Sequence, residues 1–273
     1  MYEQKYIDRE KSWLAFNARV LQEAADSTVP LLDRLRFVGI FSNNLDEFFR
    51  VRYAAIRRLS LSGISGEKYL GGISAHQLIK DITEIVIQQQ SESLRILGNI
   101  EAELESENIF IINETQITPK QECFLKDFYN QKLSPELVTI ILNDLAVFPI
   151  LKDTLGYLAV RLELANDEVR YALIEIPKTI NRFVVLPSDD EKQYVILIDD
   201  VIRFKLKNIF NIFDYKSVSA HMIKITRDAQ LDIDSDLSKS MLEKIASSVK
   251  DRRIGEPVRF IYDNLIEEDT LQF

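Results

Sequence analysis

The sequence predicts an α+β protein in which an all-helical N-terminal domain precedes a domain with a mixed or mostly antiparallel sheet. Two observations support this. Apolar residues recur at helical spacing over most of the first hundred residues, as in a helical bundle. From residue 108 onward, short β-branched and aromatic runs alternate with turns and helical stretches. We therefore predict a helical domain at 1–107 and an α+β domain at 108–273.

The N-terminal domain is predicted to consist of long helices. The first covers 8–25, and we expect its apolar stripe to face the core (Trp13, Phe16, Val20, Leu21 and Ala24). A second helix begins near Pro30, because proline suits the first helical turn, and the apolar pattern continues past position 52. The glycine-rich stretch 62–72 is a predicted loop, and 74–107 is a long amphipathic helix.

The second domain is predicted to open with a strand at 109–113 and a helix that begins at Thr118-Pro119 and runs to Lys132. Two alternating runs, 156–164 and 169–177, are joined by a turn at Asn166-Asp167, which predicts a hairpin. The other predicted strands are 137–142, which we expect to be buried, 182–186, 194–198, 218–226 and 258–262. Further helices are predicted at 199–210, capped by Asp199-Asp200, and at 234–250.

The composition is that of an ordinary globular chain, with 46% hydrophobic and 28% charged residues. It holds no apolar run long enough to span a bilayer, and its start lacks the basic-then-apolar layout of a secretion signal. A single cysteine, Cys123, excludes an internal disulfide and fits a reducing compartment. We expect a cytoplasmic protein without a transmembrane segment, and peripheral association with a membrane stays open.

The charge is acidic overall but locally basic. A net charge of −9 argues against general binding to nucleic acid. Between positions 34 and 58, however, six arginines face two acids (Arg34, Arg36, Arg50, Arg52, Arg57 and Arg58 against Asp46 and Glu47). This segment is either a solvated, salt-bridged helix face or a surface that binds phosphate, since guanidinium groups hold phosphate oxygens in pairs.

Two amides interrupt an apolar, helix-forming run at Ser42-Asn43-Asn44. Asn44 with Glu47 three places on has the form of a helix N-cap and its reciprocal partner. An exposed asparagine at such a corner offers donors and an acceptor that suit the edge of a purine base. The alternative is that the two asparagines only punctuate the helix, and the pattern leaves open whether the helix breaks there.

Residues for catalysis are scarce. Two histidines, His76 and His221, and one cysteine cannot assemble the usual zinc site, so we predict no metal centre. Paired acids fall where turns and caps are expected. Arg227 and Arg259 stand at strand ends, a suitable place for contacts to anions. The residues alone therefore predict a two-domain protein with a basic corner and no nucleophile.

Several runs, in order along the chain, resemble the N-terminal part of bacterial polyphosphate kinases, which move the γ-phosphate of ATP onto polyphosphate. The runs are 6–10, 12–25, 30–52 with Ser42-Asn43-Asn44-Leu45-Asp46-Glu47-Phe48, 170–177, 225–229 and 255–260. The resemblance implies a helical domain and a head domain, followed in the family by two catalytic domains. It also implies that Asn44 approaches the adenine of ATP.

The same resemblance implies what this chain lacks. In the family the phosphorylated histidine and the Mg²⁺ site belong to the C-terminal domains, so we expect no catalytic residue here and a piece that is inactive alone. The end at Phe273, soon after an apolar strand, fits such a piece. ATP, polyphosphate and further copies of the chain, as a dimer or tetramer, are the implied partners.

Three readings of the function remain at this stage. In the first, Asn44 lies at the base of a nucleotide and Arg50 and Arg52 lie near phosphate. In the second, the chain mainly builds the oligomer and has no direct ligand role. The third, a nucleic-acid module that uses the arginines of 34–58, is disfavoured by the acidic charge and by the absence of interleaved aromatic and basic residues.

Overall fold

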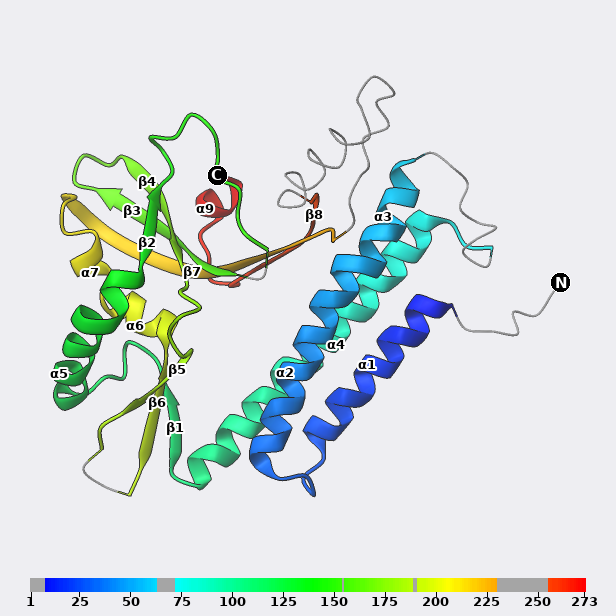
Figure 1. The fold of residues 1–273 in the computed structure, drawn as a ribbon, viewed down its shortest axis with the longest axis horizontal. Coiled ribbons are helices and arrows are strands. Elements are labelled where there is room, and N and C mark those ends of the chain that lie inside the picture. Colours follow the sequence, from blue (N-terminus) through cyan, green and yellow to red (C-terminus); the bar gives the residue numbers. More distant parts are fainter. Residues whose placement is uncertain (1–7, 63–71, 154, 189–190, 230–254) are drawn as a thin grey trace, which may run out of the picture. The chain divides into compact units, whose positions relative to one another are not determined.

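A computed structural model describes residues 8–62, 72–153, 155–188, 191–229 and 255–273. The chain divides into two compact units, each built from two segments. The first unit comprises residues 1–104 and 226–259, and the second comprises 105–225 and 260–273. The first unit is helical and the second contains the sheets (Figure 1), which confirms the predicted α+β class.

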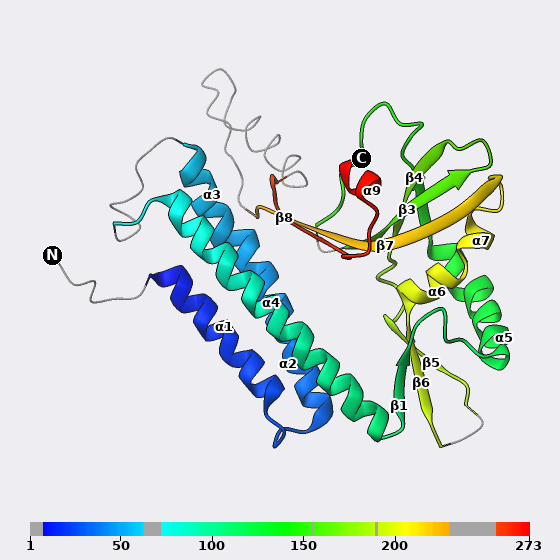
Figure 2. The ribbon, with the colours of Figure 1, turned by 180° about the vertical axis from the view of Figure 1, so that it is seen from behind.

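The helices of the first unit lie side by side in both views of the ribbon (Figures 1 and 2). They are α1 (Arg9–Ala25), α2 (Leu31–Glu47), a π-helix η1 (Phe48–Tyr53), α3 (Ala54–Leu61) and α4 (Ala75–Ser106). The Asp8 carboxylate accepts bonds of 3.0 Å from the backbone N–H groups of Glu10 and Lys11 and so caps α1. Pro30 stands one residue before α2, as its N-cap. Most of the predicted loop 62–72 lies outside the described residues.

The inner face of α1 differs from the predicted stripe. Phe16 is 64% exposed, and Trp13 is half-buried. Glu10 and Asn17 are buried instead, together with the apolar side chains of the same face (Leu14, Leu21 and Ala24). The prediction placed the stripe about one position too far round the helix, because it counted only apolar residues and ignored polar ones that find partners inside the bundle.

Two sheets lie in the second unit, except that residues 226–227 of β7 and 257–259 of β8 count with the first unit. A mixed three-stranded sheet has the order β1 (Ile109–Ile112), β6 (Gln193–Leu197) and β5 (Phe183–Leu186), with β1 parallel and β5 antiparallel to β6. The five-stranded sheet has the order β2 (Val138–Ile141), β4 (Val169–Glu175), β3 (Gly156–Leu164), β7 (Tyr215–Arg227) and β8 (Pro257–Tyr262). The predicted hairpin is β3–β4, and Asp167 in its turn has a φ of 66°.

The remaining helical elements are short. They are α5 (Pro119–Phe128), a π-helix η3 (Tyr129–Leu133), a 3₁₀ turn η4 (Ser134–Glu136), α6 (Ile198–Phe204), α7 (Leu206–Ile209) and α9 (Glu268–Gln272). Thr118 and Gln121 form a capping box at the start of α5, as the Thr118-Pro119 signal suggested.

The five-stranded sheet carries a core on each face, because successive residues of a strand point to opposite sides. Leu158, Val160 and Leu162 of β3 pack in one cluster with Leu125 of α5 and Val201 of α6. The alternate residues of β3 join a second cluster on the other face (Tyr157 and Ala159, with Leu142, Leu151, Leu155 and Leu173).

Three predictions in this unit need correction or lie outside the structure. β2 is an edge strand with Val138 half exposed, and it is not the buried strand that its apolar run suggested. Asp199 and Asp200 do not cap a helix, since both are buried in the first turn of α6, whose N-cap is Leu197. The predicted helix at 234–250 falls outside the described residues. Among the helices that the structure does describe, none is long and apolar enough to cross a bilayer.

Candidate functional site

Asn44 lies inside α2, one turn before its end, and its side chain is partly exposed. Its Nδ2 donates a hydrogen bond of 3.0 Å to Oδ1 of Asn17 on α1. Asn17 is fully buried, and its own Nδ2 donates to the carbonyl oxygen of Phe41 at 3.2 Å. The Asn44 amide is therefore held on one side by the bundle, while the rest of the group reaches the surface.

The predicted N-cap at Asn44 is wrong. Helix α2 runs through Ser42-Asn43-Asn44 without a break, and the N–H of Phe48 bonds back to the carbonyls of Asn44 and Leu45. Glu47 is exposed and stands 3.9 Å from Arg50 instead of reaching back to Asn44. Burial of Leu45, Phe48 and their apolar neighbours keeps the helix intact, because tertiary packing overrides the weak preference of asparagine for helix ends.

The helix widens at Phe48, about one turn after Asn44. Residues Phe48–Tyr53 form a π-helix, a rare form that frequently occurs at functional sites. The Phe48 ring stacks on Trp13 of α1 at a centroid distance of 5.0 Å. Arg52, in the same widened segment, lies 3.8 Å from the Glu10 carboxylate, and its guanidinium is 5.9 Å from the Trp13 ring centroid.

These contacts define the α1–α2 seam, which consists of three cross-helix pairs: Asn17 with Asn44, Trp13 with Phe48, and Glu10 with Arg52. Asn17 and Glu10 are separated by two turns of α1, about 10 Å at the usual helical rise. The seam therefore presents an amide at one point and a guanidinium two turns away. Chemically, an amide can donate and accept hydrogen bonds, and a guanidinium can pair with an anion.

The two arginines predicted to face phosphate already have partners. The Arg52 side chain is 34% exposed and pairs with Glu10, which also accepts two bonds from Arg9. The Arg50 side chain is 26% exposed, and the Arg50 carbonyl accepts a bond of 3.0 Å from the Ala229 N–H. A phosphate would have to replace a carboxylate at either arginine.

The arginines of the basic segment 34–58 lie in ion pairs and carbonyl contacts, as the plainer of its two interpretations expects. Arg34 is buried, donates to the carbonyl of Ala24 at 2.8 Å and pairs with Glu103 at 2.6 Å. The other arginines also have acidic or carbonyl partners (Arg36 with Asp33, Arg57 with the Pro257 carbonyl and Arg58 with Asp228). Little positive charge is left for a nucleic-acid backbone.

Of the two arginines predicted at strand ends, Arg227 is the last residue of β7, whereas Arg259 lies within β8, and both contact residues of the first unit. The Arg259 side chain is 10% exposed and pairs with Asp46 at 3.1 Å, and its guanidinium lies 4.7 Å from the Phe49 ring centroid. Burial lowers the pKa of Arg259, and the Asp46 charge opposes this shift. Arg227 donates to the Gly255 carbonyl at 2.9 Å. A Cβ at Gly255 would meet the Asp228 carbonyl oxygen at 2.1 Å, so only glycine fits this close approach.

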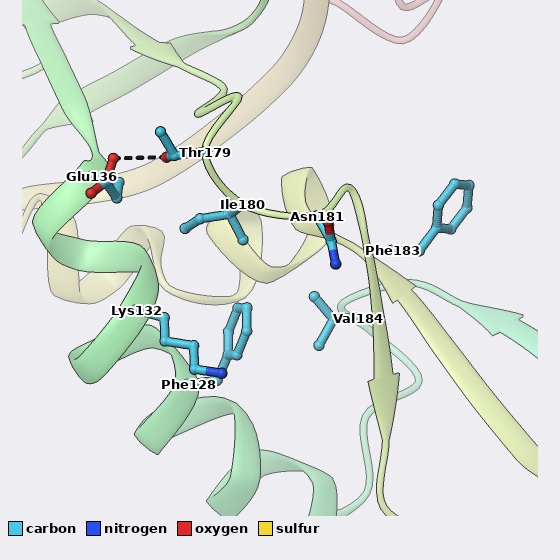
Figure 3. A pocket seen from close by; sticks show the side chains of 8 residues that line it. All are labelled: Phe128, Lys132, Glu136, Thr179, Ile180, Asn181, Phe183 and Val184. Carbon is cyan, nitrogen blue, oxygen red and sulfur yellow. Dashed lines mark hydrogen bonds between the residues drawn. The ribbon is translucent and has the colours of Figure 1, made fainter.

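A pocket of about 450 Å³ lies in the second unit (Figure 3). It is lined by side chains from α5, η3, η4, β5 and the segment before β5 (Phe128, Lys132, Glu136, Thr179, Ile180, Asn181, Phe183 and Val184). Glu136 accepts a hydrogen bond of 2.7 Å from Thr179, and Phe183 points away from the other side chains. With one lysine and one engaged carboxylate, this pocket offers no catalytic pair.

Acidic and histidine side chains do not form a metal centre within the described ranges. His76 is exposed, while His221 lies between Asp263 at 3.5 Å and Glu267 at 3.4 Å. Burial and the neighbouring Asp199 carboxylate raise the pKa of Asp200 to about 7, against the opposing effect of Arg203. The Asp200 carboxyl therefore loses its proton at a higher pH than an ordinary aspartate does.

Sequence reasoning proposed Asn44 and Arg52 but did not point to the α1 residues that contact them. Glu10 and Asn17 are polar residues seven positions apart on the buried face of α1. A polar pair at two-turn spacing inside an apolar stripe was the available signal. Its meaning was hidden because both partners lie far along the chain, Asn44 being 27 residues from Asn17.

Family models match most of the chain. Residues 6–112 match the polyphosphate kinase N-terminal domain, and residues 120–273 match the polyphosphate kinase middle domain.

Individual relatives carry the same name. Polyphosphate kinases of Yersinia pestis, Vibrio cholerae and Escherichia coli K12 are 38%, 40% and 41% identical over 99%, 98% and 95% of this chain. The chain spans only 39%, 38% and 38% of their lengths. A crystal structure of polyphosphate kinase from Porphyromonas gingivalis is similar over 98% of this chain and 37% of that one, with a TM-score of 0.76 and 29% identity.

Proposed function

This chain belongs to the polyphosphate kinase family, as its N-terminal and middle domains, and we propose that it forms the adenine side of an ATP site. The whole enzyme would transfer the γ-phosphate of ATP reversibly to inorganic polyphosphate. The proposal rests on the partly exposed Asn44 amide, which the buried Asn17 holds at the α1–α2 seam. An amide offers a donor and an acceptor side by side, as the edge of adenine requires.

We assign the phosphate end of the nucleotide to Arg52 and Arg50. Arg52 lies two helical turns along the seam from the amide, on the side of Glu10. Phosphate oxygens accept paired hydrogen bonds from guanidinium, so they would replace the carboxylates of Glu10 and Glu47. Glu10 would keep its bonds from Arg9.

The reactive chemistry belongs to polypeptide outside this chain in our proposal. Phosphoryl transfer needs a nucleophile and charge neutralisation. Neither a nucleophile beside the seam nor a cluster able to hold Mg²⁺ occurs in the described part of the chain. The catalytic histidine, which becomes phosphorylated, and the residues that hold Mg²⁺ would come from the part of a polyphosphate kinase that this chain does not span. A cytoplasmic location and a boundary between domains near residue 107 remain predictions.

The test of the adenine role is Asn44→Ala in the full-length kinase. Losing the hydrogen bonds to the base should raise KM for ATP roughly threefold to tenfold, with kcat and oligomeric state unchanged. Asn43→Ala, at the exposed neighbouring position, is the matched control and should leave KM as it is. An unchanged KM in Asn44→Ala would remove the nucleotide role from this residue.

A second role, in oligomer contacts, is favoured by the outer face of the three-stranded sheet. Cross-strand partners Ile111, Val195 and Val185 form an apolar row, and Phe183 with Leu197 forms the next row. Val185 is 67% exposed and Phe183 is 53% exposed. We propose that a second copy of the protein covers this sheet face, since contiguous exposed apolar rows commonly mark protein contacts.

A further inference from the structure

Asn17 is a fully buried amide whose two ends are both engaged. Its Nδ2 donates to the Phe41 carbonyl at 3.2 Å, and its Oδ1 accepts from Asn44 Nδ2 at 3.0 Å. An amide buried without partners costs free energy, so these two bonds fix how the side chain stands. Phe41 and Asn44 both belong to α2, and Asn17 alone belongs to α1. The bonds therefore run from an α2 carbonyl, through α1, to an α2 side chain.

This chain of bonds determines which end of the Asn44 amide faces outward. The Phe41 carbonyl is held in the helix and can only accept, so the nitrogen of Asn17 must face it. The oxygen of Asn17 then faces Asn44, which must present its nitrogen. If Asn44 rotated by half a turn, two acceptor oxygens would oppose each other. In the described part of the chain, the second N–H of Asn44 and its Oδ1 have no other hydrogen-bond partner.

We propose that Asn17 is a positioning residue that fixes the polarity of the Asn44 amide and makes the site select adenine over hypoxanthine. The inference rests on the proposed adenine role of Asn44. Adenine carries an amino donor beside a ring acceptor, whereas the keto purines carry an acceptor in place of that amino group and a ring N–H beside it. An amide of fixed polarity matches only one of these edges, and a freely rotating amide matches both.

The test compares ATP and ITP as substrates of the full-length kinase carrying Asn17→Leu. Leucine has a similar volume, and it releases the Asn44 amide. KM for ATP should rise roughly threefold, while KM for ITP stays constant or falls. The ratio of KM for ITP to KM for ATP should therefore decrease, with kcat unchanged. Asn17→Ala frees the same Asn44 amide and should also lower the ratio of KM for ITP to KM for ATP. This second variant provides the test if Asn17→Leu folds poorly.

The matched control is Gln89→Leu. Gln89 of α4 donates to the Leu14 carbonyl at 3.0 Å, so its loss removes a similar bond between a side chain and a helix carbonyl in the same bundle, away from Asn44. This variant should keep the wild-type ratio of KM for ITP to KM for ATP. If Gln89→Leu lowers this KM ratio as much as Asn17→Leu does, general loosening of the bundle explains the effect and the inference fails.

A double variant separates this inference from the proposed function. In an Asn44→Ala background, Asn17→Leu should change neither constant further, because Asn17 acts only through Asn44. Additive effects of the two substitutions overturn the positioning role. If Asn44→Ala alone raises KM for ATP and Asn17→Leu does not, the positioning role fails and the adenine site stands. If Asn44→Ala has no effect, the adenine site itself fails.

Discussion

Arg259 carries its charge into the interior of the first unit. Its side chain is 10% exposed, and its Nη1 lies 3.1 Å from Asp46, whose side chain is 13% exposed. Removing one member of a buried pair strands the charge of the other, which costs more than the pair itself contributes. The pair links Arg259, near the end of the chain, to Asp46 of α2, and both residues belong to the first unit.

Replacing Arg259 with methionine should therefore destabilise the first unit by about 3 kcal/mol. Urea unfolding followed by the fluorescence of Trp13, the single tryptophan, reports on this unit. Arg36→Met is the matched control, since the Arg36–Asp33 pair is exposed and should contribute less than about 1 kcal/mol. Equal decreases in the free energy of unfolding of Arg259→Met and Arg36→Met would contradict a larger contribution from the Arg259–Asp46 pair.

Asp200 should give the second unit an unusual pH dependence. Its pKa in the folded state, about 7, lies above the ordinary value of 3.8. Between these values the folded protein holds a proton that the unfolded chain releases, so the contribution of Asp200 to stability falls as pH rises and is lost above about pH 7.

The variant Asp200→Asn removes this titration. Compared with wild type, it should unfold at a higher temperature at pH 8 and show a smaller difference near pH 4, as measured by thermal melts across that range. Arg203 keeps a bond to the Ala220 carbonyl at 2.9 Å, so the variant retains one anchor there. Asp144→Asn, at an exposed acid, is the control and should follow the wild-type profile. If the melting temperature of Asp200→Asn changed with pH in parallel with that of the wild type, the raised pKa assigned to Asp200 would be wrong.

At the scale of elements, the outer face of the β1–β6–β5 sheet makes the clearest prediction. Val185→Lys places a charge in the middle of an apolar row, so it should shift the full-length protein toward smaller species in analytical ultracentrifugation. Val147→Lys is the matched control, because Val147 is 80% exposed but lies in the connection after β2. An unchanged sedimentation profile for Val185→Lys would contradict the proposed contact between two copies through this sheet face.

Elements with a strong period were predictable from sequence. Helix α4, with seven buried positions at helical spacing, and the β3–β4 hairpin with its Asn166-Asp167 turn both appear where their patterns placed them. Two kinds of element were not predictable. The π-helix Phe48–Tyr53 has no repeating sequence signature. The apolar sequence of β2 is that of a buried strand, but its exposure depends on its position at the edge of the sheet.

The candidate site was predictable only in part. A resemblance to polyphosphate kinases pointed to Asn44, but the local pattern suggested an N-cap where the structure has the interior of α2. The contact with Asn17 is a packing outcome between two helices, and no rule of local spacing specifies it. The pairing of Arg259 with Asp46 was equally out of reach, because 213 residues separate them.

At the scale of the whole molecule, the chain alone should not turn over substrate. We expect no polyphosphate formation when this polypeptide receives ATP, Mg²⁺ and a polyphosphate primer, because the seam offers binding groups and no nucleophile. A radiolabelled γ-phosphate assay checks this, with the full-length kinase as the positive control. Turnover by the chain alone would place the catalytic group within these residues.

The first unit is discontinuous in sequence, since it needs residues 226–259 as well as 1–104. During synthesis the helices therefore emerge from the ribosome well before Asp228 and Arg259, the partners of Arg58 and Asp46. The entire second unit up to Ile225 is translated in between. The helical bundle is thus completed only late in translation, and a nascent chain stalled earlier would hold Arg58 and Asp46 without these two partners.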